Sequence, residues 1–273
     1  FVKQVFLAGD HRPFNTVLIY PDLESANSPL KNMDDQQRQE YFSTVIVSVN
    51  NFLAPFERIV DFRIISRAFD DAHHELTPKG TYKRRAIEKN FADVIHSMYE
   101  KDHLSLGFGK YEVKIPNWFL REKGALSRDV SLKENVLSIP KLNASLIIKC
   151  IDEENRIFRI GNYSYSIKTK QIDLQDIFTN PFYWLGNTEI VLFAGNGIFR
   201  WFRKLESQKE IEFVERVADV IASEADKISL DEMLTAKEVS IPGLHIASVL
   251  LQSMEDEETK RSIAYFSEIL KDT

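Results

Sequence analysis

Four cations stand close together between residues 79 and 85, and Lys89 follows them on the first turns of a predicted helix. Lys79 lies inside the stretch Thr77-Pro78-Lys79-Gly80, and Lys83, Arg84 and Arg85 follow it. Proline fixes φ in such a stretch and glycine is free to take a positive φ, so the sequence predicts a tight turn. The cations after the turn oppose the dipole of a helix that begins there, because a helix N-terminus favours negative charge. Either the cluster faces an anionic ligand, or it is a solvated surface turn.

The residues after the turn predict the helix that holds these cations. Apolar side chains recur at spacings of three and four along it, at Ile87, Phe91, Val94, Ile95 and Met98. This periodicity is typical of an amphipathic helix with one buried stripe. We therefore expect the basic residues on its first turns, next to the proline turn.

Two adjacent histidines, His73 and His74, invite a metal-site interpretation because Asp70, Asp71 and Glu75 flank them. Adjacent histidines on a turn point apart, and no second cluster completes a closed set of ligands. The sequence therefore favours a polar surface loop, and we expect no metal.

Other candidates for chemistry are weaker. Cys150 lies in an apolar stretch predicted to be a strand, where a thiol is usually inert. Gly107-Phe108-Gly109 lacks the third glycine of a nucleotide-binding loop, and Gly195-Asn196-Gly197 is typical of a hairpin turn. Five aromatic residues either line a ligand cleft or pack in a core, the commoner role: Trp118, Phe182, Tyr183, Trp184 and Trp201.

Length and composition limit the classes of protein. A chain of 273 residues suits two or three domains, and a net charge of −6 argues against a general nucleic-acid or anionic-membrane binder. A single cysteine excludes an internal disulfide and is typical of a reducing compartment, so we expect a cytoplasmic protein. No apolar run approaches the ~18 residues of a membrane span. The complete protein is either cytoplasmic throughout or peripheral to a membrane.

The first hundred residues predict a compact α/β unit. Residues 1–8 and 16–20 are β-prone and joined by a tight turn, which predicts a hairpin. Asp34 or Asp35 is placed to cap a helix, and residues 60–65 alternate as a strand does. The predicted buried stripe of that helix comprises Tyr41, Phe42, Val45, Ile46, Val49, Phe52 and Leu53.

Three segments of this unit resemble, in the same order, segments of long-chain fatty acid–CoA ligases of the AMP-forming adenylating superfamily. They are QVFLAGDHRPFNTVLIYPD (4–22), LAPFERIVDFRII (53–65) and ELTPKGTYKRRAIEKNFADVI (75–95). The resemblance covers about residues 1–100. It implies the small C-terminal domain of these enzymes, a mobile lid.

The resemblance also implies a larger N-terminal adenylation domain as the partner of this lid. ATP or AMP, CoA and Mg²⁺ would then be used only in the complete enzyme, and none is expected in this chain alone. The chain starts at Phe1 and directly in a strand-like pattern. We therefore interpret it as a piece of a longer ligase, inactive by itself.

One position departs from the family pattern. Where the resemblance implies a lysine that reaches the acyl-adenylate, this chain has Thr81. Lys79 and Lys83 each lie two residues away and share a face with residue 81 if the segment is extended. By resemblance, Arg84 and Arg85 support the lid or approach CoA phosphates. The alternative is a degenerate lid that serves as a scaffold for interactions.

The remaining residues predict two further parts. Residues 104–203 form a β-rich module of unknown role, with strands at 111–115, 146–151, 156–160 and 163–168 and a last hairpin formed by 190–194 and 198–202. Residues 204–273 predict helices, one at 211–225 and then a pair that resembles a HEAT-type hairpin, a possible docking site for a protein partner. The predicted fold class is thus α+β, with boundaries at 103 and 203.

Overall fold

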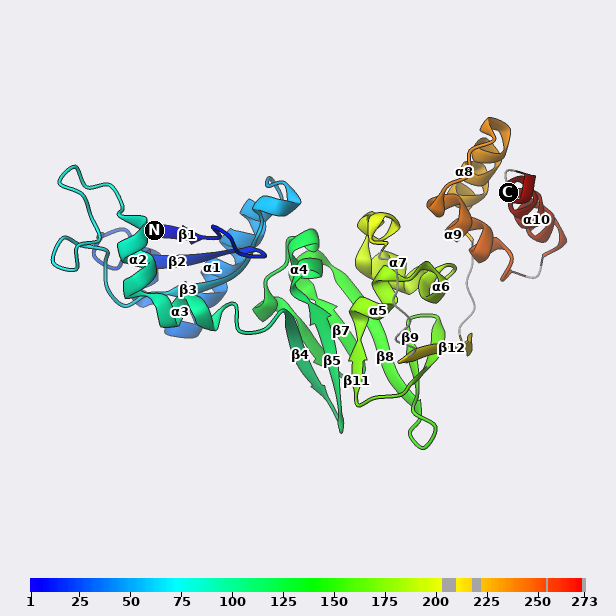
Figure 1. Ribbon diagram of the computed structural model, residues 1–273, viewed down its shortest axis with the longest axis horizontal. Coiled ribbons are helices and arrows are strands. Elements are labelled where there is room, and N and C mark those ends of the chain that lie inside the picture. Colours follow the sequence, from blue (N-terminus) through cyan, green and yellow to red (C-terminus); the bar gives the residue numbers. More distant parts are fainter. Residues whose placement is uncertain (203–209, 218–221, 254, 272–273) are drawn as a thin grey trace. The chain divides into compact units, whose positions relative to one another are not determined.

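The computed structural model describes residues 1–202, 210–217, 222–253 and 255–271 (Figure 1). The chain is α+β, as predicted, and it ends in a helical segment. The predicted boundary at 203 lies outside the described residues. The chain separates into two compact units: unit 1 comprises Phe1–Ser105, Ile115–Val130 and Ile139–Asn143, and unit 2 comprises Leu106–Lys114, Ser131–Ser138 and Ala144–Thr273.

Unit 1 is built on a sheet of three strands, β1 (Val2–Ala8), β2 (Asn15–Pro21) and β3 (Ile59–Ile64). β1 and β2 form the predicted antiparallel hairpin, and β3 joins β2 in parallel. Residues 16–19 of β2 are buried on both faces, as expected for a central strand with a continuous apolar run.

Helices cover both faces of this sheet (Figure 1). α1 (Asp35–Asn50) packs through Phe42 and Ile46 on the face that carries Val17 and Ile19. α2 (Arg84–Asn90) and α3 (Ala92–Ser97) cover the opposite face. There the predicted apolar stripe packs on the strands in one cluster: Phe6, Ala8, Leu18, Ile87, Phe91, Ile95 and Met98.

The start of α1 is confirmed, but its predicted buried stripe is too broad. The Asp34 carboxylate accepts the backbone N–H of Gln37 at 2.7 Å, and the Gln37 side chain accepts the N–H of Asp34 in return. Val45 and Val49 are 38% and 44% exposed, and Phe52 is 91% exposed. The two valines lie beside the core-facing stripe of the helix, and Phe52 lies beyond the end of the helix. None of the three side chains therefore faces the sheet.

Unit 1 also contains several shorter elements. They are α4 (Asn117–Lys123) and the 3-10 helices η1 (Pro29–Asn32), η2 (Pro55–Glu57), η3 (Ser127–Asp129) and η4 (Pro140–Leu142). The buried Asn50 amide donates to the carbonyls of Ile59 (2.8 Å) and Gly124 (3.1 Å). Gly124 caps α4 with a φ of 73°, which favours glycine.

Unit 2 contains most of the remaining strands. One sheet has the order β12-β10-β9-β8-β7-β6, and a second has the order β11-β5-β4. All four strands predicted between residues 111 and 168 are present. The strands are β4 (His103–Phe108), β5 (Tyr111–Pro116), β6 (Ser131–Lys133), β7 (Val136–Ile139), β8 (Ala144–Asp152), β9 (Ile157–Ile160), β10 (Tyr163–Ile167), β11 (Gln171–Asp173) and β12 (Ile211–Arg216).

The hairpin predicted at residues 190–202 is wrong, because this stretch is helical. Short helices α5 (Leu174–Thr179) and α6 (Pro181–Trp184) precede α7 (Thr188–Ala194) and the 3-10 helix η5 (Asn196–Arg200). The Asn187 side chain caps α7 by accepting the N–H of Ile190 at 3.2 Å. Ile190, Phe193 and Ala194 are buried at helical spacing, so the apolar run that suggested a strand is the inner face of a helix.

The helix predicted at residues 211–225 is also wrong. Residues 211–216 form β12, which pairs antiparallel with β10, and Phe213 packs against the ring of Tyr163 with a centroid distance of 5.2 Å. The predicted helical residues Val220 and Ile221 lie outside the described residues. The helix begins further on, as α8 (Glu224–Ala236), where Ser223 and Asp226 form a capping box.

The predicted helical pair is present as α9 (Ile241–Leu250) and α10 (Asp256–Lys271), and α8 packs against both. Their shared core contains Leu230, Ala247, Leu250 and Tyr265. The Tyr265 hydroxyl accepts the N–H of Ser240 at 2.8 Å and so joins α10 to the start of α9. Within the described ranges, none of the helices combines the length and apolar character needed to cross a membrane.

Candidate functional site

The predicted basic site lies on a closed loop of unit 1 between β3 and α2. Leu76 and Tyr82 form an isolated antiparallel bridge, and the N–H of Lys83 donates to the Glu75 carbonyl at 2.7 Å. Inside the bridge the chain turns back on itself, and the N–H of Gly80 donates to the backbone carbonyl of Thr77 at 2.8 Å. Gly80 has a φ of 77°, so the proline turn is present and requires its glycine.

Thr81, which stands at the position of the family lysine, closes this loop. Its hydroxyl lies 2.7 Å from the hydroxyl of Thr77, and its carbonyl accepts the N–H of Thr77 at 2.8 Å. Its own N–H donates to the Thr77 hydroxyl at 3.2 Å. The side chain of Thr81 therefore serves the loop itself.

The alternation of side chains along an extended segment places Lys83 on the same side of the chain as Thr81. It makes no such prediction for Lys79. Tyr82 lies between Thr81 and Lys83. It turns inward and packs on Phe69 with a centroid distance of 5.3 Å. Because side chains alternate along an extended segment, Thr81 and Lys83 both point away from that contact. Lys79 lies in the turn, where this alternation does not apply.

The four predicted cations differ in their contacts. Arg84 donates to the Leu7 carbonyl at 2.9 Å, pairs with Asp10 at 3.3 Å and stacks over Phe6 at 4.8 Å. It therefore joins α2 to the β1–β2 hairpin. Within the part of the chain that the structure describes, the exposed side chains of Lys79, Lys83 and Arg85 have no ion pair or hydrogen bond.

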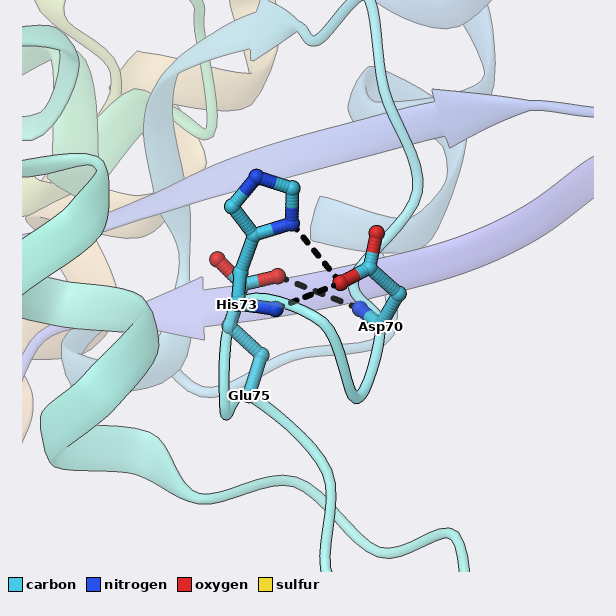
Figure 2. A group of neighbouring side chains, drawn as sticks. All are labelled: Asp70, His73 and Glu75. Atoms are coloured by element: carbon cyan, nitrogen blue, oxygen red, sulfur yellow. Dashed lines mark hydrogen bonds and ion pairs between the residues drawn. The ribbon is translucent and has the colours of Figure 1, made fainter.

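Asp70, His73 and Glu75 come together beside this loop (Figure 2). One ligand-type atom from each lies within 4.8 Å of the others, as in a metal site. The Asp70 carboxylate accepts a hydrogen bond from the backbone N–H of His73 (2.8 Å). It is also hydrogen-bonded to Nδ1 of the His73 ring (2.7 Å). The side-chain bond to His73 and then the backbone bond hold the pKa of Asp70 below its usual value. The other predicted members, Asp71 and His74, are exposed and outside this group, and His74 takes a φ of 59°.

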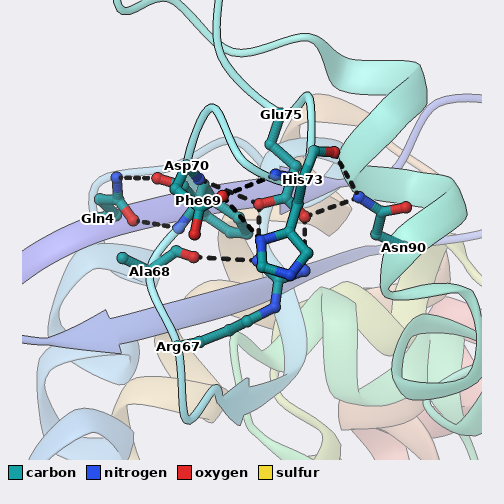
Figure 3. Close-up of polar contacts among 8 residues, drawn as sticks. All are labelled: Gln4, Arg67, Ala68, Phe69, Asp70, His73, Glu75 and Asn90. Atoms are coloured by element: carbon teal, nitrogen blue, oxygen red, sulfur yellow. Dashed lines mark hydrogen bonds and ion pairs between the residues drawn. The ribbon is translucent and has the colours of Figure 1, made fainter.

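Glu75 is fully buried, and an arginine occupies both of its oxygens (Figure 3). Arg67 donates from Nη1 to Oε2 at 2.7 Å and from Nη2 to Oε1 at 2.6 Å. Asn90 adds a bond at 2.9 Å and the N–H of Asp70 one at 3.2 Å. A metal ion would have to displace a guanidinium that carries the same sign of charge, so the geometry favours an ion pair over a metal site.

The same contacts set the charge of Glu75. Burial alone would raise its pKa, but the bonds from Arg67 and Asn90 outweigh burial and hold the pKa of the carboxyl below its ordinary value. The carboxylate is thus ionised at neutral pH. It connects the loop to α2 through Asn90, whose amide also donates to the His73 carbonyl at 3.1 Å.

A second contact fixes the loop to the edge strand of the sheet. The Gln4 amide in β1 donates to the Phe69 carbonyl at 3.0 Å and accepts the Phe69 N–H at 2.6 Å (Figure 3). The Gln4 side chain thus takes the place of a backbone hydrogen-bond partner for Phe69. The roles of Gln4, Arg67 and Asn90 were not predicted from the sequence; the only local signal was Glu75, two residues before the proline turn.

The remaining sequence candidates are dispersed. Cys150 lies in β8, as predicted, and burial, followed by nearby acidic charge, raises the pKa of its thiol. Trp184 is buried, Phe182 is 86% exposed, and the Tyr183 hydroxyl donates to the Ile211 carbonyl at 2.6 Å. These three residues are neighbours in sequence, but their side chains lie in different environments. They therefore do not line one cleft.

The fold and this loop define the class of the first unit. A three-stranded sheet between helices presents a proline–glycine turn and a basic helix start on one firmly anchored loop. Residues 1–103 match the family model of the AMP-binding enzyme C-terminal domain. This segment is accordingly a C-terminal domain of the adenylating-enzyme superfamily. Comparisons with curated proteins and with solved structures found no match.

Proposed function

We propose that residues 1–103 are the lid of an AMP-forming long-chain fatty acid–CoA ligase. The complete enzyme would convert a fatty acid and ATP into an acyl-adenylate and pyrophosphate, and CoA would then take the acyl group. The lid would move between these two half-reactions. The family match supports the adenylating class, and the resemblance of residues 4–22, 53–65 and 75–95 supports the fatty acid and CoA.

One observation carries the role of the loop: its two lysines, Lys79 and Lys83, are exposed and have no ion pair among the described residues, although the loop itself is firmly held. Glu75, Arg67 and Asn90 fix its base, whereas Lys79 and Lys83 extend from it without a partner among the described residues. Preorganised cations of this kind stabilise charge that develops on a phosphoryl group. Lys83 is the better candidate because it shares the face of Thr81.

The test uses the full-length protein that carries this chain together with an adenylation domain. Fatty-acid-dependent ATP–pyrophosphate exchange measures the first half-reaction, and acyl-CoA formation from supplied acyl-adenylate measures the second. Lys83→Ala should lower exchange about a hundredfold, the usual effect of removing one such donor. Lys79→Ala tests the other lysine, and Lys89→Ala, an exposed cation further along α2, is the matched control.

The opposite change tests the position of the missing lysine. Thr81→Lys should raise the rate of exchange and leave thioester formation little changed. Thr81 loses its bond to Thr77 in this variant, so hydrogen exchange of the loop must be compared as well. If Thr81→Lys has no effect on a loop that stays closed, and Lys79 and Lys83 are both dispensable, the lid does not take part in adenylation.

That result would favour the second candidate, a degenerate lid that acts as a scaffold. The observation behind it is Thr81, whose hydroxyl closes the loop where the family pattern has a catalytic cation. Both functions predict that this chain alone has no adenylating activity. Exchange above background with the 273-residue chain would contradict both.

A further inference from the structure

Unit 2 contains a cavity that none of the functions above uses. Its volume is about 410 Å³, within the range of ~300–1,000 Å³ that is usual for small-molecule sites. Residues 242, 245, 246 and 249 of α9 contribute one helical face to it, and residues 188, 191 and 192 of α7 contribute another. Among the described residues, the lining is formed by Thr188, Val191, Leu192, Asn196, Phe199, Asp226, Pro242, His245, Ile246 and Val249.

One lining residue, His245, has an unused hydrogen-bond donor. It is 8% exposed, and its Nδ1 accepts the backbone N–H of Gly186 at 3.0 Å. Burial lowers its pKa to about 4, so the ring is neutral at pH 7 and carries its proton on Nε2. In the described ranges this Nε2–H has no acceptor. A ligand acceptor placed in the cavity would pair with this donor.

A second unpaired donor lies next to it. The indole of Trp184 is fully buried, and its Nε1–H has no partner among the described residues. Its ring centroid is 6.4 Å from that of His245 and 5.7 Å from that of Phe199, which also lines the cavity. The rings of Phe199 and His245 thus make this end of the cavity aromatic, with Trp184 packed behind them.

The charge around the cavity excludes an anion as the preferred ligand. Asp226 lies in the lining, and its Oδ2 accepts the N–H (3.1 Å) and hydroxyl (2.6 Å) of Ser223, so it is held as a helix cap. Among the described residues of the lining there is no lysine or arginine, and His245 is neutral. An anionic ligand would meet one negative charge from these residues and no positive one.

We propose that this cavity binds a neutral, mostly apolar small molecule whose carbonyl oxygen accepts the Nε2–H of His245. The apolar walls from Val191, Ile246 and Val249 would bury the rest of the molecule. This site is independent of the loop at residues 75–85. It gives unit 2 a ligand-binding role whether or not unit 1 takes part in adenylation.

Titration of the complete 273-residue chain with prodan tests the proposal, because prodan is a neutral aromatic ketone that fluoresces at shorter wavelength when its carbonyl leaves water. We expect saturable binding with a blue shift. His245→Asn places an amide oxygen where Nδ1 accepts from Gly186 but removes the distal donor, and it should weaken binding at least tenfold. Val191→Trp fills the cavity and should abolish binding. Val136→Trp, the same change at a position on β7 outside the lining, should have no effect.

Far-UV circular dichroism and thermal unfolding first establish that each variant is folded. If His245→Asn does not fold, Val191→Trp against Val136→Trp decides the question alone. Failure of the wild-type chain to bind prodan up to 100 μM would overturn the proposal. So would binding that Val191→Trp leaves unchanged, or equally tight binding of the anionic probe ANS.

Discussion

Replacing Arg67 with methionine should open the loop that presents Lys79 and Lys83. The change retains an apolar stem beside the Phe91 ring, over which the guanidinium stacks at 4.5 Å, and removes both bonds to Glu75. A buried ion pair that loses one partner is destabilised by ~3–5 kcal/mol, because the remaining charge is uncompensated. The Arg67 side chain is 33% exposed, so water can reach the space it leaves. We therefore expect a value near the lower limit, about 3 kcal/mol.

The companion variant Glu75→Gln separates charge from shape. Glutamine fits the same space and still accepts one bond from Arg67, so the loss should be only about 1–2 kcal/mol. The double variant Arg67→Met/Glu75→Gln no longer buries a bare carboxylate and should be more stable than Arg67→Met alone. The stabilisation depends on an ionised Glu75, whose folded pKa is depressed. It is complete above the unfolded pKa of about 4.3 and is lost as the pH falls through the lower folded pKa.

Hydrogen exchange measured by mass spectrometry resolves the effect by segment. In Arg67→Met, peptides from residues 67–91 should lose protection by the stated free energy, whereas peptides from β2 should change less. Lys260→Met, which breaks an exposed pair with Glu257, is the control and should change protection by less than about 0.5 kcal/mol. If Arg67→Met exchanges as slowly as wild type, or if the double variant is the least stable, the ion pair does not hold the loop.

Three further predictions concern the rest of the chain. Lys141→Met should destabilise unit 1 by about 2–3 kcal/mol in urea unfolding, because the buried Asp129 carboxylate loses a 2.7 Å bond. Asn187→Ala should cost about 3 kcal/mol by the same measurement, since this fully buried amide bonds the Ile160 carbonyl and the backbone N–H groups of Asn162 and Ile190. Between pH 6.5 and pH 4 the wild-type chain should lose about 3 kcal/mol of stability relative to His245→Asn measured at the same pH, because unfolding lets His245 bind a proton.

Local patterns predicted the elements that position the candidate site. The β1–β2 hairpin follows from two β-prone runs around a short turn, and α2 and α3 follow from apolar residues at helical spacing. The turn at Gly80 follows from proline and glycine chemistry. Each of these depends on residues near one another in the chain, and that is where a sequence pattern carries the most information.

The contacts that hold the site in place were not predictable in the same way. Glu75 looked like part of an exposed acidic loop, but it is fully buried because Arg67 and Asn90 reach it from either side. Gln4 contacts Phe69 across 65 positions. Such contacts depend on where the loop lies on the sheet, and composition alone does not determine this.

The two errors in unit 2 have a common cause. The stretch 188–200 contains an apolar run and a glycine pair, which fit a hairpin as well as a helix; the cap from Asn187 favours the helix. Residues 211–216 contain apolar residues at mixed spacing, and pairing with β10 makes them a strand. In each place one specific contact selects between two local structures of similar propensity: the cap from the neighbouring Asn187 for α7, and pairing with the distant strand β10 for β12.

The buried ion pair also bears on the choice between catalyst and scaffold. Replacing such a pair by apolar side chains of similar volume is often neutral or stabilising, so Glu75 and Arg67 are a poor device for stability alone. Their bidentate geometry does fix one arrangement of the loop, with the N–H of Lys83 held on the Glu75 carbonyl. A lid that must place a cation within a fraction of an ångström of a phosphoryl group needs that arrangement, and a scaffold does not. Glu75→Gln should therefore reduce the rate of adenylation in the full-length protein by more than its small loss of stability explains. If the loss of activity and the loss of stability, expressed as free energies, are equal, the scaffold is favoured.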